Sequence, residues 1–124
     1  MKKILFIILL ILLPFLSFGQ QKETRPDVTF IELGSVNCIP CRMMQPVMSN
    51  IEEKYGSRVM VIFYDVLTEK QKPYAKKYGI KLIPTQVFLD KNGKEFHRHE
   101  GYYPEDEIDK LLESKGLKPD NKKG

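Results

Sequence analysis

The feature that most constrains this chain is a pair of cysteines, Cys38 and Cys41, separated by two residues. They are the only cysteines among 124 residues, and they lie between an apolar run over 28–33 and an amphipathic run over 44–55. A strand that turns into a helix here places Cys38 at the helix N-terminus, where unpaired N–H groups and the helix dipole favour a thiolate. Because the thiolate is the form that attacks disulfides, the sequence predicts a reactive thiol at Cys38.

Cys41 lies about one helical turn after Cys38 and is placed to attack a mixed disulfide formed there. That attack releases the partner and leaves an internal Cys38–Cys41 bond. A purely structural disulfide explains the pair poorly, because closing so small a loop removes little chain entropy. The spacing alone also suits half of a zinc site, which is the alternative at this point.

The first 19 residues have the composition of a secretory signal. Lys2 and Lys3 precede an apolar run over 4–16, and Ser17 and Gly19 supply small residues before a cleavage point after Gly19. The apolar run is short for a membrane span, although an uncleaved anchor is the alternative. We therefore expect an exported protein, periplasmic or otherwise extracytoplasmic, which is membrane-anchored if the signal is retained.

The charge pattern argues against a nucleic-acid partner. The formal net charge is +4, and removal of Lys2 and Lys3 with the signal leaves +2. Three lysines against one aspartate in 117–124 account for the other +2, so the middle of the chain is near neutral and no basic face is expected. We expect 20–27 to be a polar lead-in, 28–116 one folded domain, and 117–124 a basic, disordered tail.

Alternating apolar runs and turn residues predict seven elements in the order βαβαββα. The strands are expected over 28–33, 58–66, 85–90 and 94–100, and the helices over 38–55, 69–78 and 104–115. Strands joined by a helix are expected to be parallel, and the strand after the Lys91-Asn92-Gly93 turn antiparallel.

This order, with Cys-x-Pro-Cys at the first strand-to-helix turn, resembles the thioredoxin family over residues 28–116. Further matches are Pro46, five residues after Cys41, the segments Lys77-Tyr78-Gly79-Ile80 and Ile83-Pro84-Thr85, and Gly101. The resemblance implies a thioredoxin-like α/β fold, with a four-stranded mixed sheet and helices on both faces.

The resemblance also implies the residues that meet a substrate. Pro84 is expected to be cis and to lie against the disulfide, and Ile83 to pair its backbone with an extended substrate. Ile39 and Pro40, between the two cysteines, are expected to contact the substrate as well.

Four departures separate this chain from the family pattern. Asn37 stands where a tryptophan usually precedes the first cysteine, and Ile39 stands where the family has glycine. Glu32 aligns with the family's buried aspartate, and Val61 with its lysine partner. Because only about eight residues separate the expected signal from Val28, we expect no room for the first strand and helix of full-length thioredoxins.

Glu32 is expected to lie in the central strand beneath the cysteine turn. Burial there raises the pKa of a carboxyl group, which could then accept and return the proton of Cys41. The alternative is a strand glutamate whose carboxylate reaches solvent at the end of the sheet.

His97 and His99 alternate on one predicted strand and so share a face. With Cys38 and Cys41 they have the composition of a zinc site. The resemblance places their strand at an edge away from the cysteines, so we expect exposed histidines and no bound metal.

The resemblance implies an enzyme, an exported thiol–disulfide oxidoreductase that exchanges its dithiol with protein disulfides and needs no cofactor. We expect Cys38 to attack, Cys41 to resolve and Glu32 to carry the proton. The reductase direction is favoured because Ile39-Pro40 lacks the histidine of strongly oxidising relatives. A reductant outside the cytoplasm needs a membrane dithiol electron donor, and the protein is expected to be a monomer. The alternatives are a disulfide oxidase or isomerase, and a redox-inert or metal-binding module with the same fold.

Overall fold

The computed structural model describes Gly19 and residues 24–120. The elements follow the predicted order and are β1 (Val28–Gly34), α2 (Ile39–Tyr55), a 3-10 turn (Gly56–Arg58), β2 (Val59–Asp65), α3 (Lys72–Lys77), β3 (Thr85–Asp90), β4 (Glu95–Glu100) and α4 (Glu105–Ser114). The helix predicted over 69–78 is therefore shorter at both ends than expected.

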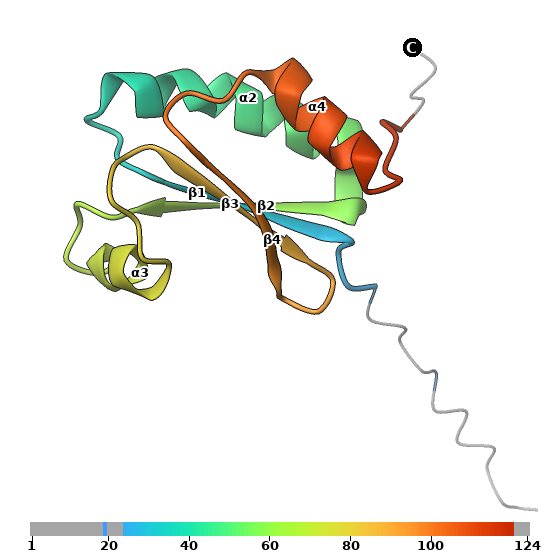
Figure 1. Ribbon diagram of the computed structural model, residues 1–124, viewed down its shortest axis with the longest axis horizontal. Helices are drawn as coiled ribbons and strands as arrows, with labels where there is room; N and C mark the ends of the chain where they lie inside the picture. Colours follow the sequence, from blue (N-terminus) through green and yellow to red (C-terminus); the bar gives the residue numbers. More distant parts are fainter. Residues whose placement is uncertain (1–18, 20–23, 121–124) are drawn as a thin grey trace, which may run out of the picture.

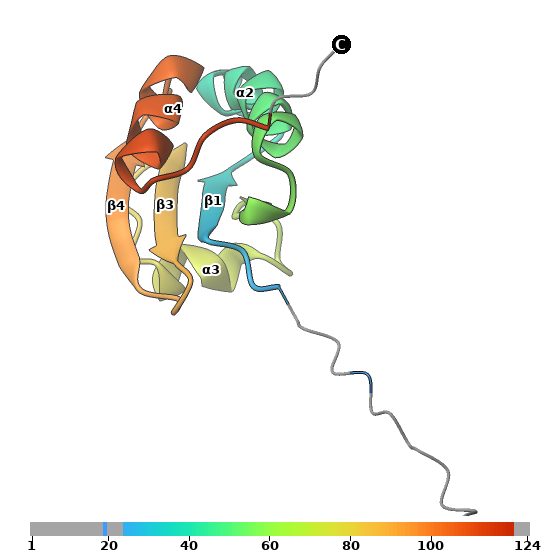
Figure 2. The ribbon, with the colours of Figure 1, turned by 90° about the vertical axis from the view of Figure 1, so that its right-hand side faces the viewer.

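The four strands form one mixed sheet in the order β2-β1-β3-β4. β1 is parallel to β2 and antiparallel to β3, and β4 is antiparallel to β3. α2 and α4 cover one face of this sheet, whereas α3 lies on the other (Figures 1 and 2). The predicted thioredoxin-like α/β class, with helices on both faces, is confirmed.

The expectation that a helix joins parallel strands is wrong for β3. Leu33, near the end of β1, pairs with Thr85, the first residue of β3, so the two strands run in opposite directions. A seven-residue strand spans about 23 Å, whereas a six-residue helix such as α3 spans only about 9 Å. α3 does not carry the chain back along the sheet, and the connection over 66–84 begins and ends at the same end of the strands, where Asp65 pairs with Gly34 and Thr85 with Leu33.

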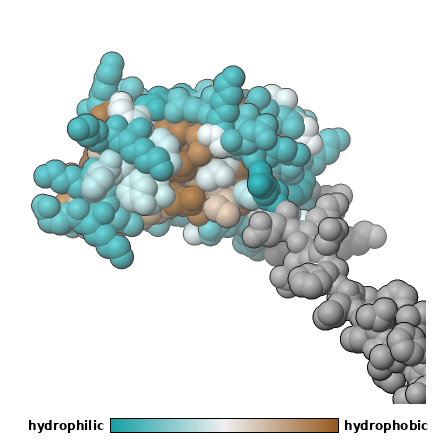
Figure 3. All heavy atoms as spheres, turned by 90° about the horizontal axis from the view of Figure 1, so that it is seen from below, coloured by the Kyte–Doolittle hydropathy of each residue, from teal (hydrophilic) through white to brown (hydrophobic). Residues whose placement is uncertain are grey.

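The larger apolar core lies between the sheet and the α2–α4 layer. Phe30 of β1 stacks on Phe88 of β3 with ring centroids 4.8 Å apart, and Ile51 and Ile108 pack there from the two helices. The core on the α3 side is smaller, with four buried residues (Ile31, Leu33, Val66 and Val87). Figure 3 shows apolar side chains at the surface on this side, because one short helix covers only part of the sheet.

The predicted tail over 117–124 is corrected at its start. Leu117 is buried against the core. The Asp120 carboxylate forms an ion pair with Arg58 at 2.7 Å, and the Asp120 N–H donates to Lys54 O at 2.7 Å. Gly116 has φ +81°, a left-handed conformation that glycine adopts without strain, and this turn brings the chain back toward α2. Residues 121–124 lie outside the described residues.

The predicted signal, apart from Gly19, also lies outside the described residues. Within the described part of the chain, no helix has the length and apolar character needed to span a membrane.

Candidate active site

Cys38 is the N-cap of α2, as predicted, with an extended backbone (φ −102°, ψ 125°). The first turn of α2 carries no acidic side chain, so nothing there offsets the positive end of the helix dipole. Cys38 is half-buried, whereas Cys41 is fully buried, and the two are joined in a disulfide. This arrangement favours a thiolate at the more accessible sulfur of the reduced pair.

The sulfur of Cys41 lies against the backbone of Gly34, the last residue of β1. A Cβ atom at position 34 would be 3.1 Å from Cys41 Sγ and 3.2 Å from Cys41 Cβ, closer than ordinary contact. Because glycine has no side chain, the Cys41 side chain can pack directly against the backbone at position 34. The sequence analysis did not single out Gly34, although a glycine directly after an apolar run was the available signal.

The loop before Cys38 is held by Asp65 at the end of β2. Its carboxylate accepts the backbone N–H of Val36 at 3.3 Å and of Leu67 at 3.2 Å. Cys38 N–H in turn donates to Ser35 O at 3.3 Å. Asp65 thus fixes both loops at this end of the sheet, a role that the sequence analysis missed because Val36 is 29 residues away.

The Ile83–Pro84 peptide bond is cis, which confirms that prediction. Pro84 is buried, and its carbonyl accepts the N–H of Gly101 at 2.7 Å. Of the other residues expected to meet a substrate, Ile83 is half-buried, Pro40 is exposed, and Ile39 is 66% exposed. Their roles in substrate binding stay predictions.

Glu32 is completely buried on the central strand, so the alternative of a solvated strand glutamate is wrong. Loss of hydration raises the pKa of its carboxyl group to about 8, and a hydrogen bond from Gln86 acts in the opposite direction. Gln86 Nε2 donates to Glu32 Oε1 at 3.2 Å, while Oε2 has no partner among the described residues. Since side chains two residues apart on a strand share a face, Glu32 lies next to Gly34, over which Cys41 sits.

His97 and His99 lie on the edge strand β4, as predicted, but they are half-buried rather than exposed. They pair with Phe88 and Gln86 of β3 and therefore face the α2–α4 layer. His97 Nε2 is 3.1 Å from Tyr103 Oη, and His99 stacks on the Tyr103 ring with centroids 3.9 Å apart. No cluster of three or more metal-ligating side chains occurs in the described part of the chain, so the geometry does not support the zinc alternative.

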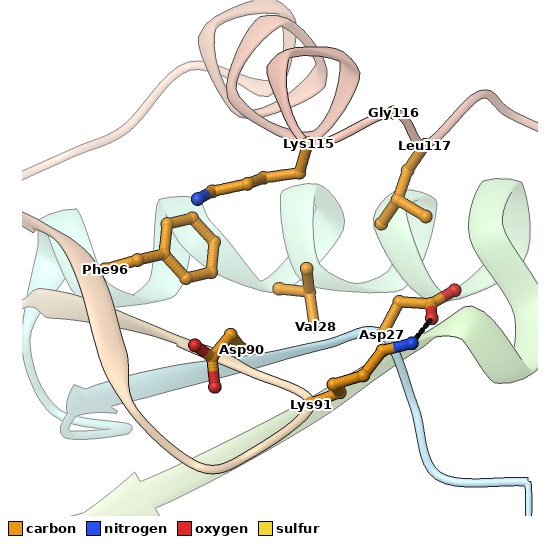
Figure 4. Close-up of a pocket in the computed structure, with 8 residues that line it drawn as sticks. All are labelled: Asp27, Val28, Asp90, Lys91, Phe96, Lys115, Gly116 and Leu117. Atoms are coloured by element: carbon orange, nitrogen blue, oxygen red, sulfur yellow. Dashed lines mark ion pairs between the residues drawn. The ribbon is translucent and has the colours of Figure 1, made fainter.

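A pocket of about 350 Å³ lies at the other end of the sheet, under the C-terminus of α4 (Figure 4). Its charged side chains are two aspartates and two lysines, with Lys91 Nζ 3.6 Å from Asp27 Oδ1 and Lys115 Nζ 4.2 Å from the ring centre of Phe96. Its charges are balanced, and β1 begins there and ends at the cysteines. The pocket is therefore separate from the thiol site.

The sequence and the fold are similar to those of known thioredoxins. Residues 19–116 match the family of thioredoxin-like domains. The chain is 33% identical over 100 residues to the chloroplastic thioredoxin Y of Oryza sativa, covering 81% of this chain and 58% of that protein. It is 33% identical over 97 residues to thioredoxin 1 of Nostoc, covering 78% of this chain and 88% of that protein.

Solved structures agree. A mutant thioredoxin from Halobacterium salinarum superposes with a TM-score of 0.63 at 28% identity, covering 72% of this chain and 74% of that one. A thioredoxin-2 from the malaria parasite secretion machinery, at 21% identity, supports the fold with a TM-score of 0.64 over 70% of this chain and 82% of that one. The matching domain and the Cys38–Cys41 disulfide at the start of α2 lead to one conclusion: this chain belongs to the thioredoxin family and is a thioredoxin-like thiol–disulfide oxidoreductase.

Proposed function

We propose that this protein is an exported reductant of protein disulfides, in which Cys38 attacks, Cys41 resolves and Glu32 carries the proton of Cys41. The observation that carries the proposal is the half-buried Cys38 at the N-terminus of α2, with Cys41 fully buried behind it. An accessible thiolate and a protected second thiol are the two parts that dithiol–disulfide exchange requires.

The reaction has two exchange steps. The Cys38 thiolate attacks one sulfur of a substrate disulfide, which forms a mixed disulfide and releases the first substrate thiolate. Cys41 then loses its proton to the Glu32 carboxylate and attacks Cys38 Sγ, which forms the Cys38–Cys41 bond and releases the second substrate thiolate. Two electrons pass from the protein dithiol to the substrate, and the protein ends in its disulfide form.

The buried position of Glu32 supports its role as proton carrier. A carboxyl group with a pKa of about 8 accepts and returns a proton near neutral pH, whereas a solvated glutamate stays ionised there. Its place beside Gly34 puts it on the same face as Cys41. Resolution by Cys41 is the step that needs a base, since the Cys38 thiol is already stabilised as a thiolate.

Residues around the disulfide support binding of an extended protein segment. Ile83 and Pro84 lie in one loop, and Ile39 and Pro40 begin α2. Three further large side chains are exposed on neighbouring loops (Val36 at 55%, Leu67 at 66% and Leu82 at 45%). Their loops all lie at the end of the sheet that carries Cys38, and an apolar surface there would suit the apolar segments that misoxidised proteins expose.

The reducing direction rests on the residues between the cysteines. The side chains of Ile39 and Pro40 provide no hydrogen-bond donor and no positive charge that would add to the stability of the Cys38 thiolate and so of the reduced form. Strong oxidants owe their high potential to a stabilised reduced form. A reductant in an exported compartment is spent after one turnover, so a membrane dithiol donor is part of the proposal.

The proposal of export rests on the first 19 residues, with cleavage after Gly19 and a periplasmic or other extracytoplasmic location. A tagged full-length chain, expressed in a bacterium with a periplasm, should appear there in shortened form. Retention of the full-length protein in the membrane would favour the uncleaved anchor instead.

The test of direction is the equilibrium of the Cys38–Cys41 couple with glutathione. The potential should lie nearer about −270 mV, that of thioredoxin, than about −120 mV, that of a strong oxidant. A value above roughly −160 mV would favour the oxidase function. Failure to exchange at all would leave a redox-inert binding module.

A further inference from the structure

Gln86 is a fully buried amide in the middle of the site, and all of its polar atoms are engaged. Nε2 donates to Glu32 Oε1 at 3.2 Å and to the carbonyl oxygen of Gly101 at 3.0 Å. Its Oε1 is 2.8 Å from His99 Nδ1. An amide has two N–H donors and one carbonyl oxygen, so these contacts use both donors and the acceptor.

These contacts determine the orientation of the Gln86 amide, that is, which side carries Oε1 and which carries Nε2. A carbonyl oxygen only accepts, so Gly101 requires an N–H from Gln86 on its side, and that same nitrogen faces Glu32. The amide oxygen then faces His99, whose Nδ1 must carry a hydrogen in order to donate. His99 is itself held by its stack on Tyr103. If the amide turned over, its single oxygen would face both the carbonyl oxygen of Gly101 and Oε1 of Glu32, which is repulsive.

We propose that Gln86, oriented by His99 and Gly101, is a positioning residue that commits Oε1 of Glu32 to a hydrogen bond and leaves Oε2 to exchange the proton of Cys41. The inference deepens the proposed function and rests on Glu32 as the proton carrier. In this chain the partner of the buried carboxyl group is therefore a neutral amide from β3. The family pattern has a lysine as that partner, and Val61 occupies the lysine position here.

No charged side chain replaces that lysine among the described residues around Glu32. The buried or half-buried titratable groups on this side of the sheet include Cys41 and Tyr55 of α2, Asp65 at the end of β2, His97 and His99 of β4, and Tyr103. The Tyr55 hydroxyl donates to Asp109 of α4, and the shift in the pKa of Glu32 has only burial and Gln86 as its causes. Asp65 is occupied by two backbone amides, and α4 presents apolar side chains such as Ile108. The bond from Gln86 is therefore the contact that favours the ionised form of Glu32 over the protonated one.

Two hydrogen-bonded neighbours of Gln86, Gly101 and His99, connect its amide to other parts of the molecule. Gly101, which accepts from Gln86 through its carbonyl oxygen, donates its own N–H to Pro84 O at 2.7 Å. The amide that holds Glu32 is thus joined to the loop of Pro84, one of the residues proposed to meet the substrate. His99 joins the same amide to the half-buried edge strand.

The experiment measures two quantities on the full-length protein and its variants. The first is the midpoint of Glu32 titration in the oxidised protein, read from the infrared band of its protonated carboxyl, which Glu32→Gln identifies by removing it. The second is the pH profile of mixed-disulfide resolution. The variants are Gln86→Leu, which removes the amide, and His99→Phe, which keeps an aromatic ring against Tyr103 but removes the Nδ1 donor.

Gln86→Leu should raise the Glu32 midpoint by about one pH unit, because a hydrogen bond to a charged group is lost. His99→Phe should raise it by less, since the amide remains but is free to turn. His99→Asn, which offers an amide N–H in place of Nδ1–H, should restore the wild-type midpoint. His97→Asn is the matched control, because His97 bonds to Tyr103 Oη and not to Gln86, and it should leave the midpoint unchanged.

The outcomes separate this inference from the proton-carrier role. An unchanged Glu32 midpoint in both Gln86→Leu and His99→Phe overturns the positioning role, even if Glu32→Gln still slows resolution. A midpoint that moves while the resolution profile stays in place supports the positioning of Glu32 and overturns its role as proton carrier. If Gln86→Leu gives no cooperative melt, the positioning role is tested by His99→Phe and His99→Asn alone. A raised Glu32 midpoint in the first and a wild-type midpoint in the second support it, and equal midpoints overturn it.

Discussion

The two sulfurs of the site have different surroundings, although only two residues separate them. Cys38 caps α2 and is half-buried, while Cys41 is packed against Gly34 with no exposed surface. In the reduced protein, alkylation at mildly acidic pH should therefore modify Cys38 well before Cys41. Mass spectrometry of the two peptides at successive times measures this order, and equal or reversed rates would contradict the assigned roles.

The carboxyl group of Glu32 should affect rate and stability through the same pKa. Glu32→Gln should leave the first attack by Cys38 nearly intact and slow resolution by on the order of 10²-fold, the lower end for general acid–base catalysis. Stopped-flow reduction of a disulfide substrate separates the two steps, with accumulation of the mixed disulfide as the sign of slow resolution. An unchanged resolution rate would reduce Glu32 to a buried strand residue.

The same variant should be more stable than the wild type, by an amount that depends on pH. The pKa of Glu32 is raised from 4.5 to about 8 by burial, so its favourable contribution is complete below pH 4.5 and is lost as the pH rises toward 8. The advantage of Glu32→Gln should therefore grow across this window and stay level above it. Denaturant melts of the oxidised proteins at a series of pH values measure the difference, and a constant difference would argue against the buried carboxyl.

Gly34 offers a test of the space beneath Cys41. Gly34→Ala places a methyl group 3.1 Å from Cys41 Sγ, so the sulfur must move by a few tenths of an ångström. We expect slower resolution and an altered redox potential, with little change in the first attack by Cys38. Gly93→Ala, in the β3–β4 turn far from the site, serves as a control for changes that only affect stability, and equal behaviour of both variants would contradict this packing argument.

At the scale of the elements, the pattern of apolar runs predicted the order of strands and helices but not the direction of β3. The run over 85–90 is apolar in any orientation, and its direction depends on how far the preceding helix travels. The sequence suggested a helix over 69–78, and the observed α3 keeps only Lys72–Lys77. The direction of β3 is set by the point at which the connection over 66–84 rejoins the sheet, beside the end of β1, and the pattern of apolar runs does not contain that information.

The site could be predicted where its residues are neighbours in sequence. Cys38, Cys41 and the cis bond before Pro84 belong to local motifs, and the structure places them as expected. Gln86 and Asp65 hold partners that are 54 and 29 residues away, which only the fold brings together. The histidines show the same limit, because the alternation of His97 and His99 gives their shared face but not which face it is.

The segment after α4 behaves as part of the domain. Leu117 packs into the α2–α4 core, so Leu117→Ala should lower the free energy of unfolding by about 2 kcal/mol, the lower end for truncating a buried leucine. Lys118→Ala, at the exposed neighbouring position, should change stability by less than about 0.5 kcal/mol. Denaturant melts measure both, and equal effects would restore the view of a disordered tail from 117 onward.

At the scale of the whole molecule, redox direction and stability are linked. A couple with a low potential is one whose disulfide form is favoured, so the oxidised protein should unfold at a higher denaturant concentration than the reduced protein. Each 30 mV corresponds to about 1.4 kcal/mol for this two-electron couple. Paired melts in the presence and absence of a reductant measure the difference, and a more stable reduced form would indicate an oxidant.

The path of the chain also decides where the protein can be held. β1 enters the sheet at the end opposite the cysteines, and the segment after α4 leaves at that same end (Figure 1). The seven residues of β1 put about 23 Å between its first residue and the disulfide end. A tether, dye or second domain joined before residue 24 or after residue 120 is therefore attached away from Cys38. Joined in this way to a solid support, the protein would keep its disulfide turned toward the solution, which suits an immobilised reagent for reducing proteins in flow.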